Sequence, residues 1–545
     1  MPVKKLNLQR IKGAIPAWHG KIAEADLLPV CAAVREGGGR LLALWGSDER
    51  ALSPEEAKTA LVSAPSLNGF ALHVVLVNET GLVALSLPLS AQQPVYPDLS
   101  LIFPAANRMQ RAAYDLLGIK AIDAKDQRAW LRHAAWREGS FPLRKDFVAV
   151  CQHDSGAPAG EEASAIVQDA TQIQDDYPFV QVEGQGVHEI PVGPVHAGII
   201  EPGHFRFSVV GEKVLRLEAR LGYTHKGIEK LLENKALCAA AKLVGRVSGD
   251  STVAYAWAYA MAVEGVADIT PPDRALWLRA LFLERERIAN HLGDLGYLGN
   301  DVALSFAYAQ FWILKEQVLR NNATLFGHRY LMDKIIPGGV TTGIDESGKK
   351  TLRDESVMLE QEIHTLRSIF DEHAGVQDRY MGTGRVEPKL AAALGLCGLA
   401  GRASSQTWDS RVQFPCAPYD KLDVKIATHH HGDVAARVIV RFDELFESLR
   451  LQRDILINLI GGEDLAYPVT SLPPHRFGAG MLEGWRGEVM VAIHTDEKGN
   501  LTRVHPHDPS WQNWPALEHA IMGNIVPDFP LINKSFNLSY SGCDL

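Results

Sequence analysis

The sequence has 545 residues, with 55 lysines and arginines against 65 aspartates and glutamates, and a formal net charge of −10. That length is enough for two to four domains, and a composition of 46% hydrophobic and 22% charged residues is that of an ordinary globular protein. The negative charge, without a basic stripe carrying interleaved aromatic residues, argues against nucleic acid as a partner.

Residues 1–150 are predicted to form an α/β domain. A short apolar run at 40–45 predicts a buried strand. Apolar segments on both sides of the turn sequence at 78–81 predict a β-hairpin over 70–87. Apolar residues at helical spacing then predict a helix at 107–117.

Residues 151–186 are acidic and poor in large apolar side chains, and this composition predicts a flexible linker. Residues 187–545 are predicted to form a second domain, a mainly helical bundle with small β-hairpins at its two ends. Alternating apolar residues predict these hairpins over 205–217 and 488–505. Apolar residues at three- and four-residue spacing predict the helices, at 238–264, 274–298, 302–332, 351–373 and from an N-cap at Asp433 to about 459. The expected fold class is therefore α+β.

The cysteines and the apolar runs bear on the cellular compartment. The six cysteines lie far apart and include no Cys-x-x-Cys pair, so we expect a reducing cytosol and no zinc or iron–sulfur site in this chain. Residues 1–6 lead into no signal sequence, and no apolar run is long enough to cross a bilayer. We expect a soluble chain that can sit on a membrane partner.

Several motifs resemble those of respiratory complex I and of its hydrogenase relatives. The segments at 114–119 and 141–146 resemble the small peripheral-arm subunit of complex I. Motifs of the neighbouring large subunit follow in the expected order, at 192–198, 201–206, 225–230, 284–293, 337–339 and 419–423. The chain is thus identified as a member of the superfamily of complex I and membrane-bound nickel–iron hydrogenase large subunits. The fusion of small and large parts is similar to the hydrogenases of formate hydrogenlyase type.

The resemblance implies that a bimetallic site has lost its ligands. In the hydrogenases, two Cys-x-x-Cys pairs hold nickel and iron. The corresponding residues here are Ser248 and Ser251 in the first pair, and Ser539 and Gly542 in the second. Thiolates bind such soft metals, whereas hydroxyls and an absent side chain do not. Cys543 is one residue beyond the expected position and is interpreted as a small structural residue, so we expect no metal centre.

The resemblance also implies a site for a quinone headgroup. A histidine and a tyrosine bind the quinone in complex I; His204 matches the histidine, but Gly249 stands at the position of the tyrosine. Asp301 matches an acidic residue that pairs with that histidine. Such a carboxylate would orient the imidazole and raise its pKa, which suits general acid work. We predict a His204–Asp301 pair, with a purely structural polar contact as the alternative.

Further charged residues have two interpretations each. Glu229 matches a carboxylate that relays protons in hydrogenases, but it could equally be a buried ion-paired residue, with Arg246 as a candidate partner. Arg246 and Arg402 are the candidate cofactor-binding arginines; Arg402 could serve a nearby iron–sulfur cluster or a carboxylate. Asp250 could fill the vacated pocket with charge or face water.

Three consecutive histidines, His429, His430 and His431, point in different directions, so a solvated loop is expected there rather than a metal site.

Two main hypotheses for function follow from the resemblance. In the first, the chain is a peripheral subunit of a membrane-bound redox complex and forms one wall of a cavity for quinone or another acceptor. It holds no cofactor itself, and iron–sulfur clusters reside in a small partner subunit. A ferredoxin-like subunit and antiporter-like membrane subunits belong to the same complex on the cytoplasmic side of a prokaryotic membrane, where electron transfer drives ion translocation. In the second, the chain is a non-catalytic coupling subunit. An active hydrogenase is the least favoured alternative, and a stand-alone scaffold conflicts with the many family motifs.

Overall fold

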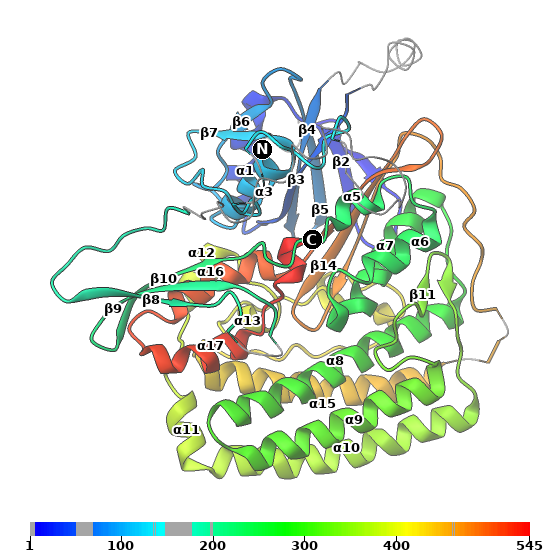
Figure 1. Cartoon of the computed structure of the whole chain (residues 1–545). Coiled ribbons are helices and arrows are strands. Elements are labelled where there is room, and N and C mark those ends of the chain that lie inside the picture. The colour runs from blue at the N-terminus through cyan, green and yellow to red at the C-terminus, as the bar shows by residue number, and fades with distance from the viewer. Residues whose placement is uncertain are drawn as a thin grey trace, which may run out of the picture.

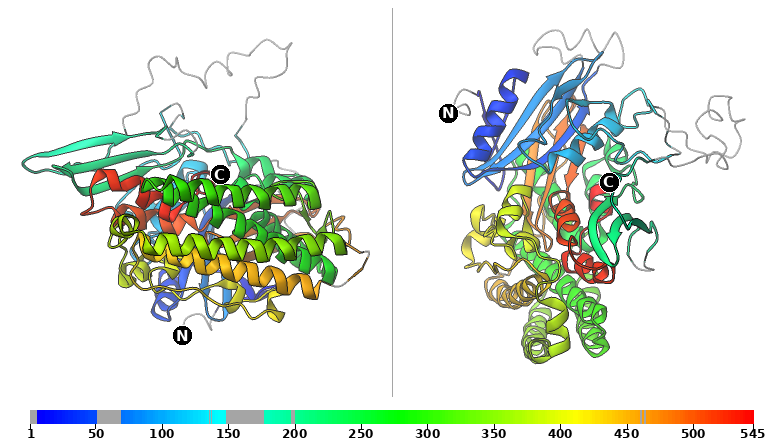
Figure 2. Two further views of the ribbon diagram at one scale, coloured as in Figure 1. Left: turned by 90° about the horizontal axis from the view of Figure 1, so that it is seen from below. Right: turned by 90° about the vertical axis from the view of Figure 1, so that its left-hand side faces the viewer.

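A computed structural model describes residues 6–50, 69–134, 136, 138–147, 177–196, 200–459, 461–462 and 464–545. In Figure 1 an N-terminal sheet lies at the top, a second sheet and short helices occupy the middle, and four long helices form the base. The right-hand view of Figure 2 shows the same succession from the side.

The N-terminal sheet has five strands in the order β1-β2-β5-β4-β3. Their bounds are β1 (Gln9–Ile11), β2 (Ala17–Lys21), β3 (Arg40–Asp48), β4 (Phe70–Asn78) and β5 (Gly81–Leu89). Helices α1 (Glu24–Glu36) and α3 (Ala106–Leu117) share a core with this sheet, and short strands β6 (Val95–Pro97) and β7 (Lys120–Ile122) pair in parallel. The predicted buried strand, hairpin and helix of this domain are all confirmed.

A three-stranded antiparallel sheet extends from the body of the molecule at the left of Figure 1. It consists of β8 (Val187–Val192), β9 (His204–Val210) and β10 (Lys213–Arg220). The predicted hairpin is confirmed, with Gly211 at a φ of 58° in its turn. Strand β8 was not predicted, because its alternation of buried and exposed residues is weak. Of the predicted linker, residues 151–176 lie outside the described part of the chain.

The prediction of one continuous helix at 238–264 is wrong, because the structure interrupts it. Short helices α5 (Ile228–Leu232) and α6 (Leu237–Val244) are followed by a single 3₁₀ turn (Gly249–Ser251) and then by α7 (Thr252–Ala267). Ser248 has extended backbone angles, φ −140° and ψ 121°, which turn the chain between the two helices. Apolar spacing continues through the break because Val247 is buried as well, so periodicity alone could not reveal it.

Four long helices form the bundle, namely α8 (Asp273–Asp301), α9 (Ser305–Phe326), α10 (Glu346–Glu372) and α15 (Val434–Asn458). Short strands β11 (Ile335–Ile336) and β12 (Gly339–Val340) lie between α9 and α10. The predicted cap is confirmed, since the Asp433 carboxylate accepts the Ala436 N–H at 2.8 Å. Short helices connect α10 to the last third of the chain: α11 (Ala374–Tyr380), α12 (Pro388–Leu394), α13 (Gly398–Arg402) and α14 (Ser410–Gln413).

The C-terminal sheet connects the N-terminal sheet to the bundle. It consists of β13 (Phe477–Glu483), β14 (Glu488–Thr495) and β15 (Leu501–His507), and α16 (Ser510–Ala520), α17 (Phe529–Phe536) and α18 (Ser541–Asp544) follow it. On one side, the apolar helix α7 packs against β13 and β14. On the other, β15 contacts β3, and the Arg503 side chain of β15 donates to the Gly46 carbonyl of β3 at 3.0 Å. None of the described helices combines the length and apolar character required to span a membrane.

Candidate functional site

The four positions that match hydrogenase metal ligands lie together in the structure. Ser248 precedes the 3₁₀ turn before α7 and Ser251 is its last residue, while Ser539 lies just before α18 and Gly542 within it. The Ser539 hydroxyl donates to Ser248 Oγ at 3.1 Å and accepts the Gly542 N–H at 2.9 Å. All three serines are buried. The structure therefore brings together the four positions that match metal ligands, and none of them carries a thiol.

A charge pair occupies the centre of this site. The Arg486 guanidinium donates to both Asp250 carboxylate oxygens, at 2.7 and 2.6 Å, and to Ser251 Oγ at 3.2 Å. The Ser248 hydroxyl donates to the same carboxylate at 2.8 Å. Burial alone would raise the pKa of Asp250, but Arg486 and Ser248 outweigh it and lower that pKa to about 2. Of the two interpretations of Asp250, the structure supports the one in which it fills the pocket with charge.

Asp508 closes the position of the fourth ligand. A Cβ atom added to Gly542 would lie 2.5 Å from both Cγ and Oδ2 of Asp508. The Asp508 carboxylate cannot move away freely, because it accepts the Tyr255 hydroxyl at 2.7 Å and the Ser510 N–H at 2.8 Å. Three hydroxyls, a glycine and a fixed guanidinium do not fit a nickel–iron centre, which requires four converging thiolates.

Cys543 lines a cavity to which neither Arg486 nor Asp250 contributes. Its side chain is buried, and Met109 and Trp511 also line this cavity of about 20 Å³, at the junction of the N-terminal and C-terminal parts. Burial and the nearby Asp508 raise the pKa of its thiol well above the ordinary value. The structure thus agrees with its interpretation as a small structural residue.

The charge pair lies just beneath the surface of the chain. Gly249 is exposed, and a Cβ atom there would contact only Met332 Cε at 3.5 Å. The Asp250 side chain retains 35% of its accessible surface, whereas Arg486 retains 7%. Gly249 and Asp250 therefore form the open side of the site, where a bound molecule or a neighbouring protein could approach it.

The predicted His204–Asp301 pair is not formed. His204 begins β9, with its Nδ1 atom 3.3 Å from the Gly193 carbonyl oxygen. Asp301 ends α8, where burial raises its pKa to about 6 and the Lys534 charge only partly opposes that rise. No hydrogen bond or ion pair between described residues joins the two side chains. The local sequence around His204 and Asp301 could not reveal that they do not pair. The distance between the two side chains depends on how the β8–β10 sheet packs against α17.

The segment directly before His204 lies against one of the two loops of the former metal site. The Glu201 carboxylate accepts the N–H groups of Tyr540 and Ser541 at 3.3 and 3.2 Å. A Cβ atom at Gly203 would lie 2.5 Å from the Tyr540 ring. The segment before His204 is thus held against the loop that contains Ser539.

Glu229 is buried and ion-paired, but with partners other than the expected one. Its Oε1 atom lies 2.7 Å from both Arg503 and His505. Arg246 instead forms a bidentate pair with Asp333, at 2.9 and 2.8 Å. Burial would raise the pKa of Glu229, but the Arg503 charge and the His505 hydrogen bond lower it to about 2.

Replacing Glu229 by glutamine is expected to destabilise the protein in a pH-dependent way. A carboxylate whose pKa falls from about 4.5 when unfolded to about 2 when folded contributes about 3 kcal/mol. That contribution is complete above pH 4.5 and is lost as the pH falls towards 2. In denaturant unfolding at neutral pH, Glu229→Gln should therefore have a lower free energy of unfolding than the parent. This difference in free energy should become smaller in acid. The surface pair Glu360–Arg453 provides the control, since Glu360→Gln should change stability by less than about 1 kcal/mol at either pH.

Arg402 is fully buried within the chain. Its guanidinium lies 2.7 Å from Glu444, 2.6 Å from Glu483 and 3.7 Å from Asp409. Of the two interpretations of this arginine, the structure supports the carboxylate partner, since no surface of the side chain remains for a cofactor. His429, His430 and His431 lie in a loop, as predicted.

Arg486 and Asp508 belong to this site and were not predicted from the sequence. Arg486 lies in the tight turn between β13 and β14, and its neighbours Gly484 and Gly487 hydrogen-bond to each other at 2.7 and 3.2 Å. An arginine between two glycines, directly before the predicted hairpin at 488–505, is a signal that could have been noticed. The identity of its partner was not accessible, because Asp250 is distant in sequence.

Comparisons with known proteins identify the family of each part of the chain. The family model for the 30 Kd subunit of respiratory-chain NADH dehydrogenase matches residues 21–152. The model for the 49 Kd subunit of the same enzyme matches residues 301–476 and 468–545. The two matches follow the order of the N-terminal domain and the large domain described above.

Individual relatives include both hydrogenases and quinone reductases. Formate hydrogenlyase subunit 5 of Escherichia coli (strain K12) is 29% identical over 513 residues, which cover 93% of this chain and 85% of the relative. Carbon monoxide-induced hydrogenase of Rhodospirillum rubrum is 30% identical over 361 residues, covering 64% of this chain and 97% of the relative. An NADH-quinone oxidoreductase chain of Bacteroides thetaiotaomicron is 26% identical over 420 residues, covering 76% of this chain and 78% of the relative.

A solved structure shares the fold of the larger part of the chain. A chain from the membrane-bound sulfane sulfur reductase, an archaeal respiratory membrane complex, aligns with a TM-score of 0.63 and 25% identity. The alignment covers 66% of this chain and 99% of that chain. This protein therefore belongs to the family of complex I 49 Kd-type and hydrogenase large subunits, with a 30 Kd-type domain fused in front of the large-subunit domain.

Proposed function

We propose that this chain is a peripheral subunit of a membrane-bound, complex I-like redox complex, and that it forms one wall of an acceptor cavity without holding a nickel–iron centre. The observation that carries the proposal is the Arg486–Asp250 pair, which lies among the four former ligand positions. A fixed cation–carboxylate pair has no redox chemistry of its own. In this proposal, electrons come from an iron–sulfur cluster of a small partner subunit.

The acceptor is proposed to be a quinone or a molecule that takes its place. The names of the relatives differ in this respect: some are NADH-quinone oxidoreductase subunits, one complex is a sulfane sulfur reductase, and others are hydrogenases. Exposed Gly249 leaves room beside the charge pair for a headgroup. A guanidinium just behind that opening would stabilise negative charge on an acceptor as electrons arrive, and His204 is the candidate proton donor.

The remaining partners follow from the same placement. A ferredoxin-like subunit would supply electrons, and antiporter-like membrane subunits would use the redox energy to move ions. The chain would lie on the cytoplasmic side of the membrane, held there by these subunits. The membership of the relatives in membrane-bound complexes supports this part of the proposal.

The second candidate function, a non-catalytic coupling subunit, is favoured by one observation. The former metal pocket is filled by a hydrogen-bonded ion pair. In that case the charge pair would transmit electrostatic change from the partner cluster to the membrane subunits, and no acceptor would bind.

Reoxidation of the intact complex distinguishes the two functions. The iron–sulfur clusters are reduced chemically, a soluble quinone is added, and the return of cluster absorbance is followed. Under the acceptor proposal we expect rapid reoxidation, slowed by about 100-fold or more in His204→Ala because the proton donor is lost. Gly249→Trp should also slow it, by filling the open side, whereas Gly249→Ala should not.

His188→Ala is the matched control, because His188 is an exposed histidine on the neighbouring strand β8. Clusters that stay reduced in the parent complex would support the coupling function instead. Reoxidation that is fast and equal in the parent, His204→Ala and Gly249→Trp would contradict the proposed acceptor site.

A further inference from the structure

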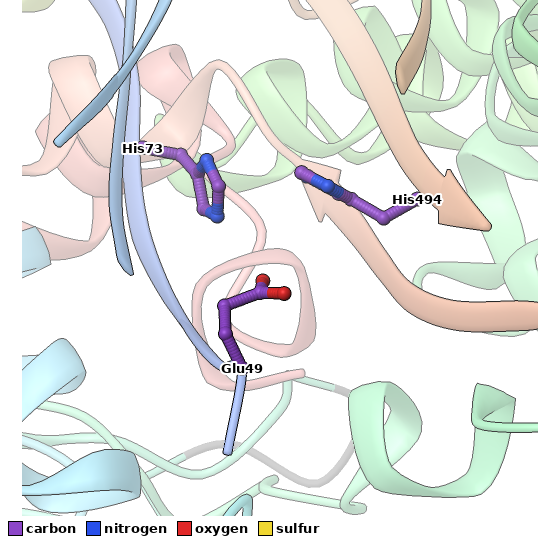
Figure 3. Close-up of side chains that lie close together, drawn as sticks. All are labelled: Glu49, His73 and His494. Atoms are coloured by element: carbon purple, nitrogen blue, oxygen red, sulfur yellow. The ribbon is translucent and has the colours of Figure 1, made fainter. Parts of the chain in front are cut away.

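Three side chains with metal-binding atoms converge between the N-terminal sheet and the C-terminal sheet. Glu49 follows the end of β3, His73 lies on β4 and His494 lies on β14. In Figure 3 the two imidazoles face each other from opposite sheets, and the Glu49 carboxylate points into the space between them. One ligand atom from each residue lies within 4.8 Å of the other two.

The two histidines are arranged differently, and each arrangement suits a ligand. The Nδ1 atom of His73 lies 2.9 Å from Ser86 Oγ, which fixes the ring and directs Nε2 towards Ser47 and Glu49. A hydrogen bond on the second ring nitrogen is the usual way in which proteins orient a metal-binding histidine. The Nε2 atom of His494 is buried and has no hydrogen-bond partner among the described residues. A buried polar nitrogen without a partner among the described residues is one that a bound metal ion could satisfy.

Glu49 also lacks a compensating cation. Its Oε1 atom accepts the Ser47 hydroxyl at 2.5 Å, and no lysine or arginine in the described ranges forms a salt bridge with it. The adjacent Arg50 is turned away, towards Asp48 and Asp146. The carboxylate is therefore available to a bound cation.

We propose that Glu49, His73 and His494 bind one Zn²⁺ ion, which ties the 30 Kd-type domain to the C-terminal sheet of the 49 Kd-type domain. Two imidazoles and a carboxylate are a common zinc ligand set, and Ser47 Oγ or a water molecule would complete it. A tetrahedral zinc site places its ligand atoms roughly 3.4 Å apart, so ligand atoms that lie within 4.8 Å of one another need to approach by at most about 1.4 Å.

The position of the site gives it a structural role. Glu49 and His73 lie in the segment matched by the 30 Kd model, and His494 lies in the segment matched by the 49 Kd model. Nearby contacts between these parts are polar or aromatic, such as the Arg503 side chain donating to the Gly46 carbonyl at 3.0 Å and the Trp45 ring stacked on His505. A metal ion at this junction would fix the relative position of the two fused domains.

The test measures Zn²⁺ binding to the full chain. His429, His430 and His431 are first replaced by alanine, because this exposed triplet could bind metal weakly. After treatment with EDTA and desalting, the chain is titrated with Zn²⁺ against a chromophoric competing chelator. We expect one tight site per chain, weakened roughly 100-fold or more by Glu49→Gln or His494→Gln. His188→Gln, which removes an exposed histidine elsewhere, should leave the affinity unchanged.

Two further readouts distinguish the site from a misfolded variant. Co²⁺ in place of Zn²⁺ should give visible absorption bands of a tetrahedral site in the parent, and these should be absent from Glu49→Gln. Zn²⁺ should raise the melting temperature of the parent and of His188→Gln, but not that of Glu49→Gln. Because Glu49 is half-buried and forms no salt bridge among the described residues, the Glu49→Gln variant should fold. A parent that binds no Zn²⁺ at micromolar concentration, or binding that survives in a folded Glu49→Gln, would overturn the proposal.

Discussion

Replacing Arg486 by methionine is expected to lower the free energy of unfolding by about 2–3 kcal/mol. The substitution removes both hydrogen bonds to Asp250, at 2.7 and 2.6 Å, and the bond from Nε to the Asn537 carbonyl at 2.6 Å. Breaking a buried ion pair by removing one partner costs about 3–5 kcal/mol, because the other charge remains uncompensated. The partial exposure of Asp250 places the expected cost at or below the lower end of that range.

The cost should depend on Asp250 and on pH. A second substitution, Asp250→Asn, should recover part of the loss, because it removes the uncompensated carboxylate. In the parent, the lowered pKa of Asp250 means that its contribution is present above about pH 4 and is lost as the pH falls towards 2. The difference between the parent and Arg486→Met should therefore shrink in acid.

Denaturant unfolding and melting temperature measure this effect, and Arg453→Met provides the control. Arg453 forms a half-exposed pair with Glu360, so its replacement should cost less than about 1 kcal/mol. An Arg486→Met protein as stable as Arg453→Met would show that the charge pair does not hold the former metal site together.

The second large effect is expected at Gly542. Gly542→Ala should cost about 2–3 kcal/mol, and Gly542→Cys at least as much, because the new Cβ atom would lie 2.5 Å from the Asp508 carboxylate. That carboxylate is held by Tyr255 and by the Ser510 N–H, so it cannot yield without breaking a buried hydrogen bond. Restoring four cysteines at 248, 251, 539 and 542 is therefore expected to destabilise the C-terminal segment rather than to recover nickel binding.

Gly249→Ala is the matched control for this prediction. It is the same substitution in the other loop of the former metal site, and its Cβ atom would meet only Met332 at an ordinary contact distance of 3.5 Å. We expect a change within about 0.5 kcal/mol. Adding Asp508→Ala should make Gly542→Ala less costly than it is in the parent, by at least about 1 kcal/mol of coupling. Equal melting temperatures for Gly542→Ala and Gly249→Ala would disprove the inference that Asp508 leaves no room for a side chain at position 542.

The local elements of the fold were accessible from the sequence. The hairpin of β4 and β5, the hairpin of β9 and β10, the cap at Asp433 and the long bundle helices each depend on residues close together in the chain. The interrupted helix at 245–251 and the edge strand β8 were not, because apolar periodicity there is either uninterrupted or weak.

The sequence alone determines that no thiolates are present at 248, 251, 539 and 542. It also determines the family to which the chain belongs. What occupies the place of those thiolates was decided by the tertiary structure. Arg486 meets Asp250, Asp508 closes on Gly542, and Glu229 pairs with Arg503 rather than Arg246, all across long sequence separations. The partner of a buried charge depends on which distant segments pack together, and neither periodicity nor spacing encodes that choice. The contact predicted between His204 and Asp301 failed for the same reason, since each residue is positioned by a different part of the fold.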